Sequence, residues 1–199
     1  MPESPFHFRP YIVSEVRAAG ILRPVRIRAT ETLSRGSRYE VSAICDVGAV
    51  DLRSLLRKPT SIQVVRDDGS LVRSFGGVLT RARERATTVE GRQEVVLVIE
   101  DPLEMLCLSS DYRIFQELSS KDIVSALLNE RGISKFEFRL KGTPRKRVVC
   151  TQYGETARAF IDRLLEEDGI AWFVEQGDDG PKLVFADDSS GWSETPGDK

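Results

Sequence analysis

The pattern of apolar and polar residues changes its period partway along the chain. At 25–29 and again at 39–43, apolar side chains occupy every second position, which is the period of a strand with one buried face. From Ser119 onward, two segments carry apolar residues at intervals of three and four, which is the period of an amphipathic helix. The pattern therefore predicts a β-rich first stretch and a mixed second stretch.

Turn signals join the predicted strands of the first stretch into hairpins. Ser34–Ser37, Asp67–Ser70 and Glu90–Gly91 each place a glycine between two apolar runs. The pair Gly76–Gly77 lies inside a predicted strand, where we expect a bulge or the close approach of another backbone. Long antiparallel strands have to close or be covered to protect their edges, so we expect a barrel-like architecture.

Four helical segments are predicted, each from a polar N-cap residue followed by apolar residues at helical spacing. The two longer helices each end at a glycine, the residue that most readily terminates a helix. The N-cap residues are Asp51, Asp101, Ser119 and Thr156, and the terminating glycines are Gly132 and Gly169. A strand is expected around Phe136–Leu140 and a last hairpin at 170–186.

These elements predict an α+β fold rich in β-structure, in which a barrel-like antiparallel β unit precedes a smaller α+β unit. We place the barrel-like β domain at residues 1–110. The α+β domain, with two helices packed on short strands, is placed at 111–188. Residues 189–199 are polar and contain glycine and proline, so we expect a flexible tail.

Charge gives no indication of a nucleic-acid or membrane partner. The 199-residue chain carries 29 basic and 31 acidic residues, for a formal net charge of −2. No apolar run approaches the length of a membrane span, and no charged-then-apolar N-terminal segment has the form of a secretory signal. The one basic run, at 141–147, lacks interleaved aromatic residues and is better explained as a solvated hairpin loop.

Residues that could carry catalysis or bind a metal are few. His7 is the only histidine, so neither a histidine-centred triad nor a multi-histidine metal site is available. Cys45, Cys107 and Cys150 are far apart and form no CxxC pair, and we expect them to be reduced and buried. Adjacent carboxylates precede glycines in predicted hairpin turns. We therefore expect no enzymatic activity, no cofactor and no metal.

Five motifs follow one another in a fixed order. The most extended runs over 152–170, and shorter ones occupy Glu31–Ser34, Phe75–Val78, Arg113–Gln116 and Leu183–Asp188. In this order and spacing they resemble the VgrG spike proteins of bacterial type VI secretion, over roughly residues 25–188. The residues that carry the signature are Phe75, Gly77, Arg113, Phe115, Gln116, Tyr153, Glu155, Phe160, Arg163, Leu164, Glu166 and Gly169.

The resemblance implies a structural hub that forms a homotrimer and docks on a hexameric Hcp-like tube. It also implies contacts with baseplate components and with effectors or a tip protein, assembly in the cytoplasm away from any membrane, and delivery out of the cell on firing without a signal peptide. Full-length members continue into a second tube barrel, an OB-like neck and a β-helix needle, so we expect this chain to be a fragment or an unusually short relative.

Other interpretations remain open. A contractile-phage or phage-tail-like baseplate hub shares the same architecture. An adaptor domain that binds a peptide or effector by strand addition belongs to another class, and a hydrolase with an unrecognised site would require a deep pocket with convergent polar groups. Strand ends near Arg66–Arg73 and Arg81–Arg85 are candidate interface positions, although solvated strand charges would give the same pattern.

Overall fold

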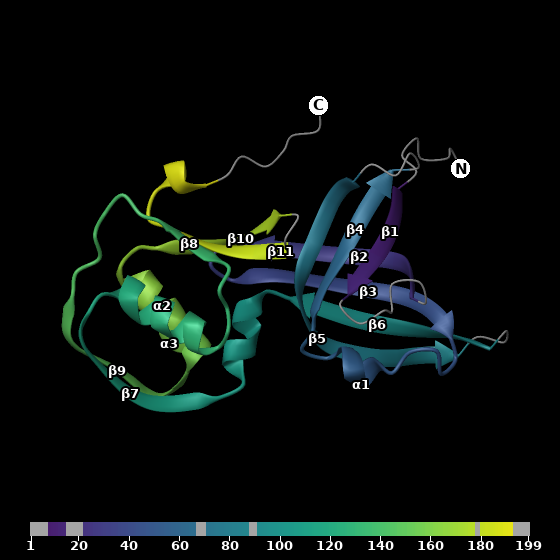
Figure 1. Ribbon diagram of the computed structural model, residues 1–199, viewed down its shortest axis with the longest axis horizontal. Helices are drawn as coiled ribbons and strands as arrows, with labels where there is room; N and C mark the ends of the chain where they lie inside the picture. Colours follow the sequence, from purple (N-terminus) through teal and green to yellow (C-terminus); the bar gives the residue numbers. More distant parts are fainter. Residues whose placement is uncertain (1–7, 15–21, 67–70, 88–90, 178–179, 193–199) are drawn as a thin grey trace. The chain divides into compact units, whose positions relative to one another are not determined.

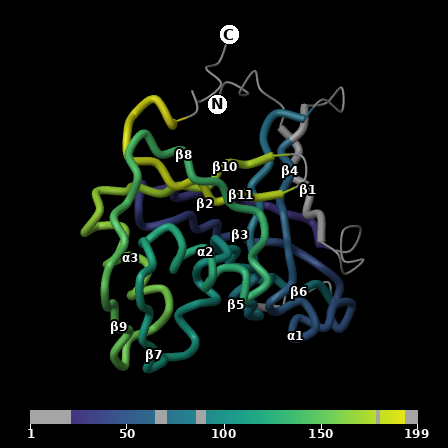
Figure 2. Tube along the Cα trace, turned by 60° about the vertical axis from the view of Figure 1, so that its left-hand side comes forward, coloured from purple at the N-terminus to yellow at the C-terminus, as the bar shows by residue number. Residues whose placement is uncertain are grey.

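The structure is a computed structural model that describes residues 8–14, 22–66, 71–87, 91–177 and 180–192. Figure 1 labels its helices and strands, and Figure 2 shows the same chain as a tube from another side. The chain divides into two compact units. The first comprises Met1–Glu31, Ser37–Asp101 and Gln176–Pro181, and the second comprises Thr32–Gly36, Pro102–Glu175 and Lys182–Lys199.

The first unit is built on a six-stranded sheet in the order β1-β4-β5-β6-β3-β2. Antiparallel pairing joins β1 to β4, β4 to β5, β5 to β6 and β6 to β3. Its register shifts twice where β5 runs along β6, and such bulges increase twist and curl a sheet into a half-barrel. The strands are β1 (Phe8–Ser14), β2 (Arg23–Thr32), β3 (Gly36–Asp46), β4 (Pro59–Arg66), β5 (Leu71–Thr87) and β6 (Arg92–Glu100).

One face of this sheet forms the core of the first unit. Alternate residues of β3, from Tyr39 through Val41 to Ala43, are fully buried and lie opposite Ile99, Leu97 and Val95 of β6, which are buried as well. The short helix α1 (Leu52–Leu55) adds the buried Leu55 to this cluster, and its N-cap is the predicted one, Asp51. The predicted alternation is confirmed for β3. It is not matched by a buried face in β2, where Val25 is 57% exposed and Ala29 is exposed, because β2 is the last strand of the sheet.

The second unit combines a two-stranded sheet, a three-stranded sheet and two helices. The two-stranded sheet pairs β7 with β9, and the three-stranded sheet has the order β10-β11-β8. The elements are β7 (Ser110–Leu118), α2 (Ser120–Glu130), β8 (Phe136–Arg139), β9 (Arg147–Thr156), α3 (Ala157–Glu167), β10 (Ala171–Gly177) and β11 (Gly180–Ala186), with 3₁₀ helices at Pro102–Cys107 and Ser189–Gly191.

Both longer helices begin and end as predicted. The Ser119 hydroxyl and the Asp122 carboxylate form a reciprocal capping box at the start of α2. At the start of α3 the Thr156 hydroxyl accepts from the Ala159 amide at 3.1 Å. Gly132 and Gly169 follow the two helices with φ of 73° and 68°, a conformation that glycine adopts at little cost.

Two details differ from the sequence-based expectation. Strand β8 pairs in parallel with β11, so the basic segment at 141–147 connects two different sheets and is not a hairpin loop. The thiol of Cys107 is exposed because it ends a 3₁₀ helix at the surface, whereas Cys45 and Cys150 are buried. His7, the predicted turn at Asp67–Ser70 and Glu90 of the predicted turn at Glu90–Gly91 lie outside the described residues, as do residues 178–179 of the predicted last hairpin.

The predicted fold class is confirmed, because the described chain is rich in strands, contains a curled antiparallel sheet and carries few helices. The predicted domain boundaries stay a prediction. Of the expected tail, Ser189–Gly191 forms a 3₁₀ helix capped by Asp188, and residues 193–199 lie outside the described part of the chain.

Candidate assembly surface

The candidate surface is the outer face of the ribbon formed by β7 and β9. In this ribbon Tyr112 lies opposite Tyr153 and Ile114 opposite Thr151. Successive side chains of a strand point to opposite faces, so Phe115 is buried against the helices while its neighbours point outward. The ribbon therefore has a packed inner face and an open outer face.

A row of stacked side chains holds the inner face against α3. The rings of Phe115 and Phe160 stack with centroids 5.6 Å apart and planes 25° from parallel. The Arg113 guanidinium lies 5.0 Å from the centre of the Phe115 ring, and that of Arg163 lies 5.2 Å from the centre of the Phe160 ring. Each cation–π contact contributes about 0.5–2 kcal/mol depending on its burial. The row links β7 firmly to α3.

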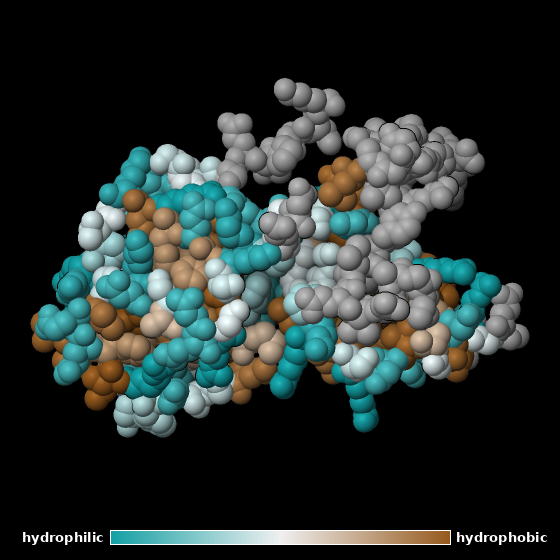
Figure 3. Space-filling view, viewed as in Figure 1, coloured by the Kyte–Doolittle hydropathy of each residue, from teal (hydrophilic) through white to brown (hydrophobic). Residues whose placement is uncertain are grey.

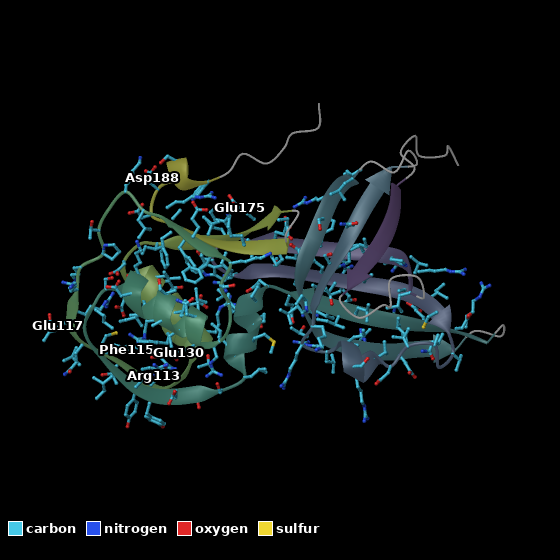
Figure 4. All side chains as sticks on the ribbon, viewed as in Figure 1. Arg113, Phe115, Glu117, Glu130, Glu175 and Asp188 are labelled. Atoms are coloured by element: carbon cyan, nitrogen blue, oxygen red, sulfur yellow. The ribbon has the colours of Figure 1, made fainter. Side chains whose placement is uncertain are left out.

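A carboxylate holds the arginine at each end of this row. Glu130 binds Arg113 through both oxygens, at 2.6 and 2.8 Å, and the hydrogen bond lowers the pKa of the Glu130 carboxyl (Figure 4). Glu155 Oε1 accepts from Arg163 Nη2 at 2.5 Å, and this hydrogen bond raises the pKa of Arg163. Bidentate geometry of this kind fixes the plane of a guanidinium, so both arginines stay stacked on their rings.

The remaining signature residues of the second unit fall on α3 and at the surface. Leu164 is fully buried in the core, and the Gly169 amide donates to the Glu166 carbonyl at 3.2 Å as the helix ends. The side chains of Glu166 and Gln116 are exposed. Tyr153 is 79% exposed on the outer face. Ten of the twelve predicted signature positions thus lie in β7, β9 and α3 or directly after α3.

Phe75 and Gly77 belong to the first unit and serve its packing. The Phe75 ring lies 5.1 Å from that of Tyr39. A Cβ added to Gly77 would overlap the carbonyl oxygen of Glu100 and lie 2.9 Å from Cγ2 of Ile99. Only glycine lets β5 approach β6 so closely, which confirms the predicted close approach of two backbones.

Gly76, the other glycine of this motif, is held by a side-chain amide. Its N–H donates to Gln176 Oε1 at 2.8 Å and its carbonyl accepts from Gln176 Nε2 at 3.2 Å, so one side-chain amide satisfies both backbone groups. The same Nε2 donates to the Tyr39 hydroxyl at 3.1 Å. Burial raises the pKa of Tyr39, with a contribution from the adjacent Glu31 carboxylate.

The turn at 32–36 is part of the second unit and is held there by Trp172. The Ser34 amide donates to the Trp172 carbonyl at 2.8 Å, and the Trp172 amide donates to the Ser34 hydroxyl at 3.2 Å. The Arg158 guanidinium lies 4.6 Å from the Trp172 ring centre and bonds Asp162 at 2.8 Å. Asp162 in turn accepts from the indole Nε1 at 3.2 Å. The motif at Glu31–Ser34 therefore ends in a fixed turn.

The outer face of the ribbon is apolar and open to solvent. Its exposed fractions are 79% for Tyr153, 70% for Tyr112, 69% for Ile114 and 55% for Val149. Figure 3 shows brown apolar atoms at the surface where Figure 1 draws β7 and β9. Side chains of these sizes leave on the order of 500 Å² in contact with water, comparable to the largest apolar patch of an ordinary monomer, which is often functional.

Gly154 shapes this face. It is the extra residue where the register shifts between Asp111 and Tyr112, and its φ is 64°. A Cβ there would lie 2.9 Å from the Tyr112 hydroxyl oxygen, so the missing side chain makes room for this ring. Tyr112 then meets Tyr153 edge to face, with centroids 5.2 Å apart. Aromatic pairs of this geometry contribute about 0.5–1.5 kcal/mol beyond their buried area.

Sequence reasoning assigned no role to Gly154 and did not single out the outer face. A signal for this face was present in the alternation of Tyr112 with Ile114 and of Val149 with Tyr153. That alternation predicts a strand with one apolar face but does not say whether the face is covered. Only the placement of both helices on the other side shows that it is open.

The predicted interface positions on the first unit are partly described. Arg81 and Arg83 are exposed on β5. Arg85 pairs with Glu94 at 3.4 Å, and Arg73 pairs with Glu31 at 2.5 Å. Exposed ion pairs of this kind contribute about 0–1 kcal/mol each to stability. The charged side chains on these strands therefore do not form an organised binding site.

Many of the titratable groups among the described residues form ion pairs. No cluster of three or more His, Cys, Asp or Glu side chains that could hold a metal is found among them. Burial raises the pKa of the Cys150 thiol, the opposite of what activates a nucleophile. On the three-stranded sheet, hydrogen bonds from Arg139 and Lys182 lower the pKa of Glu137 to about 2.

No helix in the described ranges is long and apolar enough to cross a membrane.

Comparison with known proteins places this architecture in a family. Residues 30–199 match the model of the phage tail baseplate hub (GPD) family. The type VI secretion system spike protein VgrG1b of Pseudomonas aeruginosa is 31% identical over 169 residues, which cover 85% of this chain and 22% of that protein. The spike protein VgrG5 of the same organism is 34% identical over 168 residues, covering 82% of this chain and 20% of that protein.

A solved structure shares the fold. It is the E. coli c3393 protein, described as a component of the type VI secretion system with structural similarity to the T4 bacteriophage tail proteins gp27 and gp5. The TM-score is 0.75 at 23% identity, and the match covers 97% of this chain and 49% of that one.

This chain spans about a fifth of the length of the VgrG proteins that it matches. The predicted resemblance to VgrG is confirmed at this level of similarity. Because the family model covers residues 30–199, from near the end of β2 to the last residue, the chain belongs to the phage tail baseplate hub family.

Proposed function

We propose that this chain is an assembly module of a type VI secretion spike and acts by binding other proteins. The observation that carries the proposal is the open apolar face of β7 and β9, held rigid by the Arg113–Phe115–Phe160–Arg163 row, in a chain of the baseplate hub family. A rigid apolar face of this size is suited to binding another protein, because little ordering entropy is lost when it is covered.

The finer parts of the proposal are supported by the resemblance to the VgrG spike proteins. The chain, as part of a spike, forms a homotrimer, docks on a hexameric Hcp-like tube, contacts baseplate components and carries effectors or a tip protein. It assembles in the cytoplasm and leaves the cell when the system fires. Its contribution is structural, and three arginines of the second unit support this because Arg113, Arg139 and Arg163 are each engaged by a carboxylate.

Binding to the tube tests this proposal. Purified chain is passed over an immobilised hexameric tube protein of a type VI system and, in parallel, over a phage tail-tube protein. Saturable binding to the former alone is expected. Binding to the phage tube alone would instead favour a phage-type hub, the second candidate, which the family model supports equally. Binding to neither would contradict the hub assignment.

A further inference from the structure

The ribbon of β7 and β9 leaves strand edges without partners. It is a two-stranded sheet, so along the described chain each of its strands has one edge that no other strand pairs. On β9, Arg163 Nη2 donates to the Thr151 carbonyl at 3.1 Å and occupies an acceptor there. Strand β7 is nine residues long and lies at the outer boundary of the second unit in both views (Figures 1 and 2). An open edge is a template for another strand.

The side chains of β7 would extend an apolar face onto an added strand. Tyr112 and Ile114 are 70% and 69% exposed and alternate with Arg113 and Phe115, which belong to the inner row. Directly opposing residues of neighbouring strands share a face. Apolar residues placed opposite Tyr112, Ile114 and Gln116 would therefore cover the outer face of β7 and remove it from water.

A carboxylate lies at each end of the β7 segment that carries Tyr112, Ile114 and Gln116. Asp111 and Glu117 are exposed, and neither is found in an ion pair within the described ranges; Asp111 Oδ1 accepts from the Tyr112 amide at 2.8 Å. Glu117 is labelled in Figure 4, at the outer margin of the ribbon. The two are six residues apart, roughly 20 Å along a strand. Negative charge at both ends disfavours a phosphate backbone and favours a partner with a basic residue at each end.

We infer that the free edge of β7 binds an extended segment of a partner protein by strand addition. The segment has seven residues, with a basic residue first and last and apolar residues at the second, fourth and sixth positions. This inference rests on the proposed function, because it names the occupant of the same assembly surface. Main-chain hydrogen bonds supply affinity, and the apolar and basic positions supply selectivity.

The test uses a fluorescent peptide, Lys-Val-Thr-Val-Thr-Val-Lys, and its counterpart with glutamate at both ends. We expect saturable binding of the lysine-ended peptide and roughly tenfold weaker binding of the glutamate-ended one, measured by anisotropy at low salt. Backbone N-methylation of alternate residues should abolish binding, because it removes edge hydrogen bonds and leaves the side chains in place. Protection of β7 amides from hydrogen exchange should accompany binding.

Charge-reversed variants locate the site. In the double variant Asp111→Lys, Glu117→Lys the preference should reverse, so that the glutamate-ended peptide binds better. The control Asp46→Lys, Glu84→Lys makes the same change in net charge at exposed positions of the first unit and should leave the preference unchanged. Ile114→Ser should weaken both peptides about tenfold, whereas Val25→Ser, at another exposed apolar strand position, should not.

The inference is overturned if the two peptides bind equally, if neither binds, or if both double variants shift the preference alike. The same holds if the N-methylated peptide binds as well as its parent. Each variant is checked for folding by far-UV circular dichroism, and the variants of the second unit also by the fluorescence of Trp172, whose indole is buried there, in a Trp192→Phe background. Binding to the tube protein is measured separately, so a failed peptide test with intact tube binding refutes only this inference.

Discussion

Gly77 is the position where one added methyl group should damage the first unit most. Its missing side chain lets β5 lie against the Glu100 carbonyl, which a Cβ would overlap. In Gly77→Ala the two strands must separate by on the order of 1 Å to restore a normal contact, since ordinary carbon–oxygen approaches are about 3.3 Å. Nothing flexible can give way, because both atoms belong to a strand backbone.

The expected cost is about 3 kcal/mol. Overpacking of a well-packed interior costs about 1–3 kcal/mol. Separating the strands also weakens one or two ladder hydrogen bonds, each of net value about 0.5–1.5 kcal/mol. Since 1.4 kcal/mol is a factor of ten, the opening equilibrium of the sheet should rise about 150-fold.

Thiol labelling measures the opening of the sheet in the first unit separately from the second unit. Cys45 lies buried on β3 in the same sheet, and Cys150 lies buried in the second unit as an internal reference. In a Cys107→Ser background, which removes the exposed thiol, the alkylation rate of Cys45 follows the opening equilibrium when reclosing is fast. Gly77→Ala should raise that rate about 150-fold, by far more than it raises the rate of Cys150.

Gly76→Ala is the matched control for this prediction. Its Cβ would meet Pro181 Cδ at 3.0 Å and Gln176 Oε1 at 3.1 Å, contacts that require shifts of only a few tenths of an ångström, whereas at Gly77 the Cβ would overlap a backbone oxygen. The expected cost is about 1 kcal/mol, or roughly a fivefold faster labelling of Cys45. An equal or larger effect at Gly76, or an unchanged Cys45 rate in Gly77→Ala, would refute the reasoning from close backbone approach.

Three further predictions concern the second unit. Phe160→Ala should lower the free energy of unfolding by about 3–5 kcal/mol in urea titrations, because it leaves a cavity and breaks the stacked row. A loss below about 1 kcal/mol would show that the row contributes little to stability. Gly154→Ala should cost about 1–2 kcal/mol for its left-handed backbone and shift the NMR signals of the Tyr112 ring, whereas unchanged ring signals would contradict the contact. Glu137 should titrate near pH 2 by NMR, and Arg139→Met should raise this pKa. Because the pKa of Glu137 is lower in the folded than in the unfolded chain, the stabilisation that its ion pairs give is present above the usual glutamate range and is lost as the pH falls towards 2. A titration of Glu137 in the usual glutamate range would contradict the ion network.

Local signals in the sequence were sufficient for the helices and most strands. A cap such as Thr156 and a stop such as Gly169 act on the residues next to them, so they can be read without knowing the fold. The alternation at Tyr39–Cys45 likewise reports a buried face wherever that strand finally packs. The close approach at Gly77 was predictable in kind because glycine inside a strand has few other uses.

Long-range pairings were not predictable from such signals. The parallel alignment of β8 with β11 joins residues more than forty positions apart, and no turn residue encodes it. The anchoring of Ser34 by Trp172 depends in the same way on tertiary contact. The row from Arg113 to Arg163 was visible only as separate motif residues, because stacking order is set by how α3 lies on the ribbon.

Native mass spectrometry across a range of protein concentrations tests the central claim, assembly as a hub, most directly. The account predicts a species of three copies whose share grows with concentration, and a larger complex when a hexameric tube protein of a type VI system is added. A chain that stays monomeric at every concentration and forms no complex with the tube would contradict it.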